Sequence, residues 1–319
     1  MPTIGYHASH EQFAPSELLA CVRAAEQAGF SAAMSSDHFA PWSERQGHSG
    51  FAWSWLGAAL QATSLPFGVV NAPGDRYHPA IIAQAAATLA EMFPGRFWVA
   101  LGSGQAINEH VTGARWPTKA ERNARLRECV DVIRALWAGE TVTHHGWIHV
   151  EEARLWSLPK QPPLIIGPAL SEETAEFVGG WADGFITVNA PRSQLEKLVA
   201  AFRRGGGEGK PLYLQCHLSY ARTDEEARAN AHDQWREPIF PGLVNEHLRT
   251  PRQLEAAARF VRPEDLDLSV RIAADVECHL EWLRSDLELG FDHIYLHNVG
   301  RNQQEFIEVF GERVLPELG

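Results

Sequence analysis

Eight short apolar runs recur along the chain, and segments with helical spacing separate most of them. The runs are "TIGYHAS", "AAMSSDH", "PFGVVNA", "FWVALGSG", "PLIIGPA", "DGFITVN", "PLYLQCHLSYA" and "HIYLHNVG". Apolar side chains follow a helical period over residues 15–29, 79–93, 118–137 and 302–315. Strands that alternate with helices form parallel sheets covered by those helices. Eight such units in 319 residues predict a (β/α)8 TIM barrel, formed by one domain over residues 1–319.

Two segments interrupt this repeat. Residues 139–161, "GETVTHHGWIHVEEARLWSLPKQ", are too polar and too strand-like for a crossover helix, so we expect an inserted hairpin. Residues 238–275 predict a long helical and irregular excursion before the last helices of the chain. Long insertions in compact domains usually act as lids or interfaces, and we expect that role for both segments.

Composition excludes several classes of partner. The net charge of −12 and the absence of Lys/Arg runs argue against nucleic acid and anionic membrane surfaces. No apolar stretch is long enough for a transmembrane helix, and the N-terminus lacks the features of a secretory signal, so we expect a cytoplasmic protein. Four cysteines without CxxC spacing predict neither a disulfide framework nor a metal site. A small molecule is the expected partner.

Polar side chains follow the apolar runs at their carboxyl ends. In TIM barrels this end carries the active site, whereas the strand starts serve stability. The polar residues at these positions are His7, Ser9, Asp37, His38, Asn71, Ser103, Gln105, Asn108, Ser171, Thr187, Asn189, His217, His297 and Asn298. Their collection at one end predicts an enzyme whose pocket includes the adjacent Asp37 and His38.

Each of these signals also fits a purely structural role. Asp37 as a turn cap and His38 as a histidine packed on Trp42 fit the sequence equally well. Buried, hydrogen-bonded histidines explain His217 and His297 as simply as a pocket does. The segment "GSGQAIN" lacks the third glycine of a dinucleotide fingerprint and favours a tight turn beside a flat ligand. The histidines of "HHGWIH" fit an exposed hairpin better than a metal site.

Several motifs together carry a family resemblance over nearly the whole chain. They are "GYHASHEQFAPSELL", "SSDHFAPW", "HSGFAWSWLGAA", "RYHPAIIAQAAATL", "GSGQAINE", "RLRECVDVIRALWAGE" and "WADGFIT". With them the chain resembles the bacterial luciferase-like flavin oxidoreductase superfamily and, within it, the branch of deazaflavin (coenzyme F420)-dependent glucose-6-phosphate dehydrogenases. The resemblance implies a TIM barrel, usually a homodimer, with the flavin at the strand carboxyl ends. It also implies a bulged third strand with a non-proline cis peptide, which would fall at Val69–Val70.

The resemblance implies roles for individual residues. Asp37 matches a cofactor-contacting aspartate, His38 the proposed proton-transfer base, and Asn108 an asparagine beside the ring. Trp42 matches an aromatic residue on the substrate side, and Ala169 to Ser171 lie where backbone amides meet the cofactor phosphate. The full candidate set is His38 and Gln105 for catalysis; Asp37, Val69, Val70, Asn71, Gly102, Ser103, Asn108, Ala169, Leu170 and Ser171 for the cofactor; and Trp42, His7, His217 and His297 for the substrate pocket.

The chain departs from the sugar-phosphate dehydrogenases at two places. Gln105 stands where they have a catalytic glutamate, "GSGQ" here against "GTGE" there, and a glutamine has no acidic proton to donate. The substrate-phosphate lysine after the sixth strand is replaced by "NAPRSQ", which leaves only Arg192 as a neighbouring cation. We therefore do not expect glucose 6-phosphate as the substrate. The opening "GYHASHEQF" is similar to a related subgroup thought to have reverted from deazaflavin to ordinary flavin.

The sequence thus predicts an FMN-dependent monooxygenase or dehydrogenase for a small organic substrate, reduced by NAD(P)H or by a separate reductase. FMN carries one phosphate, which a helix N-terminus capped by Ser171 accommodates. Glu172 and Glu173 in the same turn oppose the longer anionic tail of the deazaflavin coenzyme. That coenzyme is the alternative, because the motif resemblance is to enzymes that use it. A non-catalytic flavin-binding accessory barrel is a further alternative, which leaves Asp37 and His38 without a role.

Overall fold

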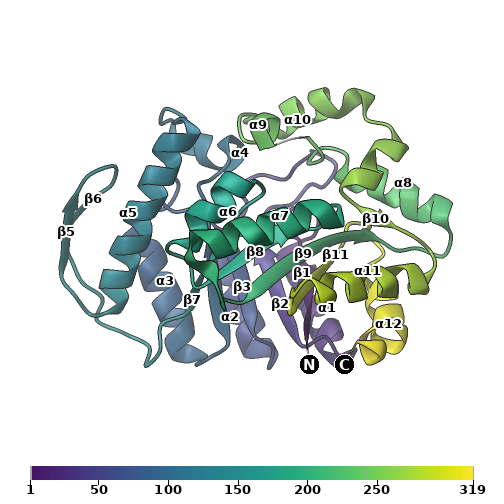
Figure 1. Ribbon diagram of the computed structural model, residues 1–319, viewed down its shortest axis with the longest axis horizontal. Helices are drawn as coiled ribbons and strands as arrows, with labels where there is room; N and C mark the ends of the chain where they lie inside the picture. The colour runs from purple at the N-terminus through teal and green to yellow at the C-terminus, as the bar shows by residue number, and fades with distance from the viewer. Residues whose placement is uncertain (1, 241, 319) are drawn as a thin grey trace.

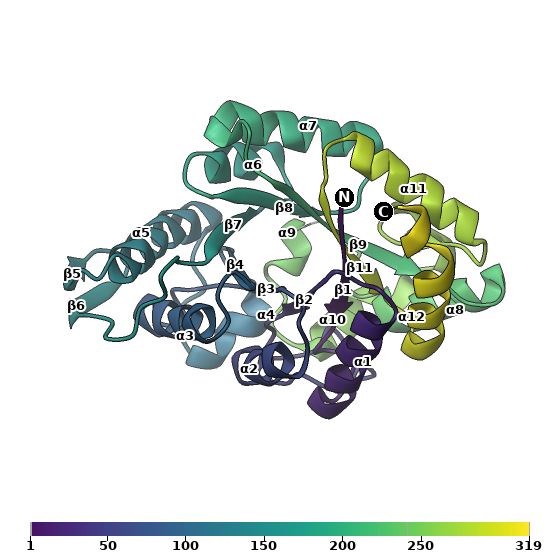
Figure 2. The ribbon, with the colours of Figure 1, turned by 90° about the horizontal axis from the view of Figure 1, so that it is seen from below.

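The computed structural model describes residues 2–240 and 242–318, and their main feature is a closed parallel barrel (Figures 1 and 2). The sheet runs in the order β10-β9-β11-β1-β2-β3-β4-β7-β8, and pairing of β8 with β9 closes it. The barrel strands are β1 (Thr3–Ala8), β2 (Ala32–Ser36), β3 (Phe67–Asn71), β4 (Phe97–Leu101), β7 (Leu164–Pro168), β8 (Gly184–Val188), β9 (Leu212–Ser219) and β11 (His293–Asn298). All eight coincide with the predicted runs, which confirms the TIM-barrel fold.

Helices surround the barrel in the view along it (Figure 2). They are α1 (Pro15–Gln27), α2 (Ala52–Ala62), α3 (Pro79–Met92), α5 (Lys119–Trp137), α6 (Glu172–Gly179), α7 (Arg192–Phe202), the π-helical turn η2 (Arg203–Gly207), α8 (Asp224–Trp235), α11 (Val276–Glu288), α12 (Gln303–Arg313) and η5 (Leu315–Glu317). Local chemistry sets their starts: Pro15 and Pro79 occupy the first helical positions of α1 and α3. Thr118 and Glu121 form a capping box at α5. No helix of the described residues is long and apolar enough to cross a membrane.

Both predicted insertions are present. Residues 139–161 contain the antiparallel hairpin of β5 (Val142–His145) and β6 (His149–Ala153), which projects beside α5 (Figure 1). Residues 238–275 contain α9 (Gly242–Asn245), α10 (Pro251–Ala257), η3 (Ala258–Phe260), η4 (Pro263–Leu268) and the short strand β10 (Arg271–Ile272). Figure 1 places α9 and α10 at the end of the barrel opposite the two chain termini.

The second insertion packs onto the carboxyl ends of the barrel strands through a separate apolar cluster. Leu254 and Leu266 of the insertion pack with Trp235 from α8, with Trp42 from the loop after β2, and with Ile107 from the loop after β4. The short helices α4 (Ala106–Glu109) and η1 (His110–Thr112) lie in that last loop. The insertion therefore joins the loops of several strands into one wall.

Large aromatic side chains fill the half of the barrel interior that is nearer the amino ends of the strands. Trp98 packs with Tyr213 and Tyr295, and its indole nitrogen donates to the Tyr295 hydroxyl over 3.1 Å. Two glycines make room for them. A Cβ at Gly68 would lie 2.0 Å from the Trp98 ring, and one at Gly5 would lie 2.4 Å from the Tyr295 ring. The interior is a packed core at this level, so a ligand has space only above it.

The expected cis peptide at Val69–Val70 is wrong for this structure. The described residues contain no cis peptide bond. Strand β3 pairs without a shift on both sides: Val69 faces Ser35 and Val99, and Val70 faces Ser36 and Ala100. The regular parallel ladder satisfies the backbone of β3 without a bulge, and the trans form is the lower-energy one for a non-proline residue.

Replacing Gly68 with alanine tests the packing of the interior. We expect Gly68→Ala to lower the free energy of unfolding by about 1 to 3 kcal/mol, because Trp98 has to shift. The matched control is Gly57→Ala in α2, whose added methyl group meets its nearest atom only at 4.0 Å. There we expect a gain of about 0.5 to 1 kcal/mol from helix propensity. Denaturant unfolding measures both, and equal effects of the two substitutions would contradict the packing argument.

Candidate active site

The inner side chains at the carboxyl ends of the strands form a ring above the packed interior. Side chains alternate between the two faces of a strand, so those in phase with Met34, Trp98 and Tyr295 face the lumen. At the carboxyl end these positions are His7, Ser36, Val70, Gly102, Pro168, Val188, Gln215, His217 and His297. We call them the mouth ring. Five of the predicted site residues belong to the mouth ring: His7, Val70, Gly102, His217 and His297.

Asp37 is buried beside the mouth ring, and its carboxylate accepts three hydrogen bonds from neighbouring side chains. Oδ2 accepts from Nδ2 of Asn71 at 2.6 Å and from Arg76 at 3.3 Å, and Oδ1 accepts from the Tyr77 hydroxyl at 3.2 Å. Arg76 also donates to the backbone carbonyl of Asp37 at 2.6 Å. Asp37 therefore fixes the backbone from which His38 extends. Arg76 and Tyr77 were not in the predicted set, although both lie in the motif "RYHPAIIAQAAATL".

A second buried acid, Glu11, holds His38. Nδ1 of His38 lies 3.2 Å from Oε1 of Glu11. The other carboxylate oxygen of Glu11 accepts from the hydroxyls of Ser36 at 2.7 Å and Ser9 at 3.0 Å. The His38 ring packs on Trp42, with 4.9 Å between ring centroids. The sequence prediction missed Glu11, and its place in "GYHASHEQF" just after β1 is the signal that was available.

The pair has a defined charge state. Burial lowers the pKa of His38, and the Glu11 carboxylate raises it only in part. Burial alone would raise the pKa of Glu11, but His38 and the Ser36 hydroxyl bring it below its ordinary value. Near pH 7 Glu11 is therefore an anion beside a neutral imidazole. The anion favours the tautomer with the proton on Nδ1, which leaves Nε2 as a proton acceptor.

Three neutral histidines from β1, β11 and β9 and a tryptophan form the part of the mouth next to β2. The ring of His297 lies 4.4 Å from that of His7, 5.5 Å from that of His217 and 4.6 Å from that of Trp235. Nε2 of His297 is 2.9 Å from the side-chain oxygen of Gln12. Burial lowers the pKa of His7 to about 4 and that of His217 to about 3, and it lowers the pKa of His297 as well. The predicted substrate-side histidines thus lie together, and Trp235 is a residue that the sequence prediction missed.

The loop after β4 closes another side of the site. The backbone amide of Gly102 donates to the carbonyl of Asn71 at 2.8 Å, which keeps the loop close to β3. A Cβ at Gly102 would lie 3.3 Å from the Pro168 side chain, so glycine lets a flat ligand approach the backbone here. Gln105 precedes α4, and its side chain makes no capping bond. It remains free to bond a ligand.

Two of the predicted cofactor residues in this loop already have protein partners. Oδ1 of Asn108 accepts from the backbone amide of Phe39 at 2.9 Å. The hydroxyl of Ser103 accepts from Nζ of Lys119 at 2.9 Å. Asn108 therefore ties the Gln105 loop to the His38 loop. This tie brings the two predicted catalytic residues to the same end of the barrel.

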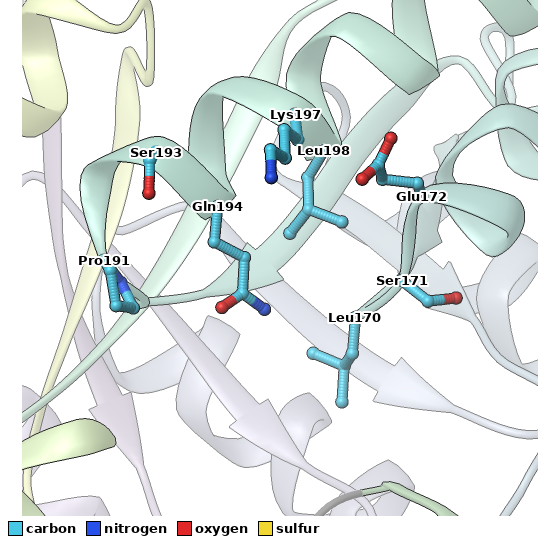
Figure 3. A pocket seen from close by; sticks show the side chains of 8 residues that line it. All are labelled: Leu170, Ser171, Glu172, Pro191, Ser193, Gln194, Lys197 and Leu198. Carbon is cyan, nitrogen blue, oxygen red and sulfur yellow. The ribbon is translucent and has the colours of Figure 1, made fainter.

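The segment after β7 borders a separate hollow between α6 and α7 (Figure 3). Its volume is about 450 Å³, and it is lined by Leu170, Ser171, Glu172, Pro191, Ser193, Gln194, Lys197 and Leu198. Ser171 caps α6 as predicted and accepts from the amide of Thr174 at 3.3 Å. Lys197 is the cation of this hollow, and Glu172 is its acid. A helix N-terminus with a lysine beside it suits a single phosphate group.

The predicted cofactor residues of β3 point in opposite directions. Val69 is fully buried in the core between the barrel and its helices, whereas Val70 packs on the interior cluster. Asn71 bonds Asp37 through its amide nitrogen. Only Val70 therefore presents its side chain to the mouth, and Val69 has no more than its backbone to offer a ligand.

Unpartnered polar atoms at the strand ends test whether a ligand fits. Buried polar atoms normally have a hydrogen-bond partner. Among the described residues, those without one include Nδ1 of His7 and of His297, Oδ1 of Asn71 and Nε of Arg76. All lie at or just beyond the carboxyl ends of the barrel strands. A flat polar ring with carbonyl and N–H edges, as in a flavin, fits this set of donors and acceptors.

A barrel with this polar end is the scaffold of a small-molecule enzyme, and comparisons identify the class. The model of the family described as luciferase-like monooxygenase matches residues 1–293. The chain belongs to that family. It is an oxidoreductase of the luciferase-like type, with a flavin-type cofactor.

Two sets of relatives refine the position of the chain in the family. F420-dependent glucose-6-phosphate dehydrogenases of Nakamurella multipartita and Beutenbergia cavernae are 36% and 35% identical to it. The alignments cover 98% and 100% of this chain and 96% and 98% of those proteins. A solved F420-dependent secondary alcohol dehydrogenase, in complex with an F420-acetone adduct, superposes with a TM-score of 0.93 at 29% identity. That match covers 100% of this chain and 99% of the solved one.

Removing the charge of Glu11 tests the His38–Glu11 pair. In Glu11→Gln we expect the pKa of His38 to fall further below its ordinary value, because burial then acts without the compensating anion. A reaction step that requires neutral His38 would then continue at lower pH in this variant than in the wild type. NMR titration of the imidazole measures the shift. The matched control is Glu128→Gln, which removes the carboxylate 2.8 Å from His144 on the hairpin. A pKa of His38 that rises or stays constant in Glu11→Gln would contradict the pairing.

Proposed function

We propose that this protein is an FMN-dependent oxidoreductase that acts on a small organic substrate at the mouth ring, with His38 as the proton-transfer residue. One observation carries the proposal: the buried Glu11 carboxylate lies 3.2 Å from Nδ1 of His38. An anion at this distance favours the proton on Nδ1, so that Nε2 is the acceptor of the neutral imidazole. A histidine that only filled space would not need a buried anion behind it. The pairing of a base with an orienting acid is a common arrangement in proton-transfer catalysis.

The residues divide the work of the reaction among them. The flavin-type cofactor supplies the hydride or oxygen chemistry when bound. Nε2 of His38 accepts a proton from the substrate, and Glu11 stabilises the imidazolium that results. Trp42 walls the pocket beside the imidazole and excludes water from it. Gln105 donates or accepts hydrogen bonds without titrating.

The hollow beside Ser171 supports FMN as the cofactor. It offers one lysine, Lys197, together with the N-terminus of α6, which matches one phosphate group. Glu172 and Glu173 occupy the first turn of α6. A longer polyanionic tail that left the hollow along α6 would pass both carboxylates. The residues of this chain at this place therefore favour the shorter cofactor.

Coenzyme F420 is the second candidate. The relatives at 36% and 35% identity carry F420-dependent activity in their names, and so does the solved dehydrogenase at 29%. The electron source in the FMN case would be NAD(P)H or a separate reductase, and we propose a homodimer for either cofactor. The alternative of a non-catalytic accessory barrel gives no role to the His38–Glu11 pair.

Titration of the apoprotein with each cofactor tests the proposal. We expect saturable binding of FMN, seen as quenching of its fluorescence, with weaker binding of F420. Lys197→Ala should weaken FMN binding, whereas Lys160→Ala, outside the hollow, should not. Tight F420 binding without measurable FMN binding would replace the cofactor but keep the class of enzyme. Binding of neither would overturn the proposed function.

Substitution of His38 tests its role in proton transfer. We expect His38→Ala to reduce turnover by about 10² to 10⁴-fold, as for the loss of a general base, with cofactor affinity little changed. Steady-state rates and the same fluorescence titration give the two quantities. His144→Ala on the exposed hairpin is the control and should leave both unchanged. Wild-type turnover in His38→Ala would show that His38 only packs against its neighbours and transfers no proton.

A further inference from the structure

The mouth ring contains no ionisable acid, lysine or arginine. Its nine positions are occupied by His7, Ser36, Val70, Gly102, Pro168, Val188, Gln215, His217 and His297. The three histidines are neutral near pH 7 because burial lowers the pKa of each of them. Every strand of the barrel lies within the described residues, so all positions of the ring are known. The side chains of the ring itself are therefore neutral, and the charged groups nearest to it are paired: Glu11 accepts from Ser36, and Arg76 bonds Asp37.

Four of the cations just outside the ring already have carboxylate partners. Arg76 bonds Asp37, and Arg192 pairs with Glu196 and Glu288 at 3.3 and 3.2 Å. Arg271 makes a two-pronged bond to Asp286 at 2.5 and 2.8 Å. Lys119 lies 3.4 Å from Glu246. Lys197 and Arg301 have no such carboxylate pair among the described residues. Lys197 lines the hollow that the proposed function gives to the cofactor phosphate, and Arg301 donates to the backbone carbonyls of Arg45 at 2.9 Å and Gln46 at 3.1 Å.

Neutral imidazoles are suited to uncharged polar groups. Each one has one N–H donor and one acceptor nitrogen. His297 uses Nε2 toward Gln12, and its Nδ1 is unpartnered, as is Nδ1 of His7. Nε2 of His217 lies 3.1 Å from the side-chain nitrogen of Gln215. Trp235 adds an apolar wall, with its ring 5.0 Å from that of His217. The ring therefore offers hydrogen bonds to a hydroxyl or carbonyl group and apolar contact to a carbon skeleton.

We propose that the substrate is an uncharged alcohol or its carbonyl counterpart, and that His7, His217 and His297 select it against phosphorylated compounds. This inference rests on the proposed function and narrows it to a substrate class. A phosphate dianion in the ring would lose its hydration without gaining a cation, which is strongly unfavourable. This selection separates the chain from the glucose-6-phosphate dehydrogenases that are its relatives.

The chemistry balances for an alcohol. Oxidation breaks the C–H bond of the carbinol carbon, and the hydride passes to the flavin-type cofactor, which gains two electrons. It also breaks the O–H bond, whose proton passes to Nε2 of His38. The product is a ketone or an aldehyde. The reverse reaction uses the reduced cofactor and protonated His38.

The first test is a substrate panel on the protein as purified with its cofactor. Uncharged primary and secondary alcohols are compared with their phosphorylated counterparts, including glucose with glucose 6-phosphate, by anaerobic bleaching of the cofactor absorbance. We expect every active compound to fall in the uncharged half. A phosphorylated compound with kcat/KM equal to or above that of its uncharged counterpart overturns the proposal, and so does the absence of any active uncharged compound. Reduction by dithionite shows independently that the cofactor is bound, so failure of the proposed function is recognised separately.

The second test uses His217 and the best uncharged substrate. We expect His217→Phe to raise KM about 3- to 10-fold, as for one lost neutral hydrogen bond, while kcat and cofactor affinity stay close to wild type. His217→Gln keeps a hydrogen-bonding side chain and should raise KM less. The control is His279→Gln. His279 is another buried neutral histidine, which lies in α11 outside the site and bonds the Ala273 carbonyl at 3.0 Å. An unchanged KM in both His217 variants, or a KM raised equally by His279→Gln, would overturn the selection by the mouth ring.

Discussion

The site depends on a negative charge buried next to the first strand. An unpaired carboxylate in this position would be strongly destabilising, so Glu11 requires the hydroxyls of Ser9 and Ser36 and the imidazole of His38. These partners come from the ends of β1 and β2. Satisfying one charge therefore fixes two loops and orients the imidazole that lies in direct contact with the anion. Burial lowers the pKa of the three histidines of the mouth ring, and the Glu11 carboxylate opposes that fall only in part at His7.

A second network of buried acids, which consists of Asp37 and Glu109, is held together by Arg76. Arg76 bonds Asp37, and its backbone amide donates to the Glu109 carboxylate at 2.8 Å. Burial raises the pKa of Glu109 to about 7, and the bonds from Arg76 oppose that rise. One arginine thus connects the loops after β2, β3 and β4. The residues that approach a ligand are held by residues that do not touch it, which is how a precise site is kept rigid.

The insertion at 238–275 supports two tryptophans that lie beside histidines of the site. Its leucines pack on Trp42 and Trp235, and these two tryptophans contact His38 and His297 respectively. The insertion therefore supplies apolar contacts to this wall, and its charged residues Glu246 and Arg271 pair with Lys119 and Asp286. Together with the neutral side chains of the mouth ring, these apolar contacts support the proposed preference for uncharged polar molecules. The same fold serves a phosphorylated sugar in relatives by name, so the difference lies in side chains and not in architecture.

The sequence by itself determined the fold and the end of the barrel that carries the site. Strand runs and helical periods reflect local geometry, and the carboxyl ends of parallel strands necessarily meet, so His7, His38, His217 and His297 were predictable as neighbours. Only the tertiary structure decided what each side chain does there. Glu11 and Arg76 became site residues because folding buries their charges against specific partners, and Asn108 and Ser103 became supports because nearby donors occupy them. The family resemblance also implied a bulged β3, whereas β3 pairs with β2 and β4 as a regular strand. Burial and pairing are properties of the assembled barrel, and no spacing in the chain encodes them.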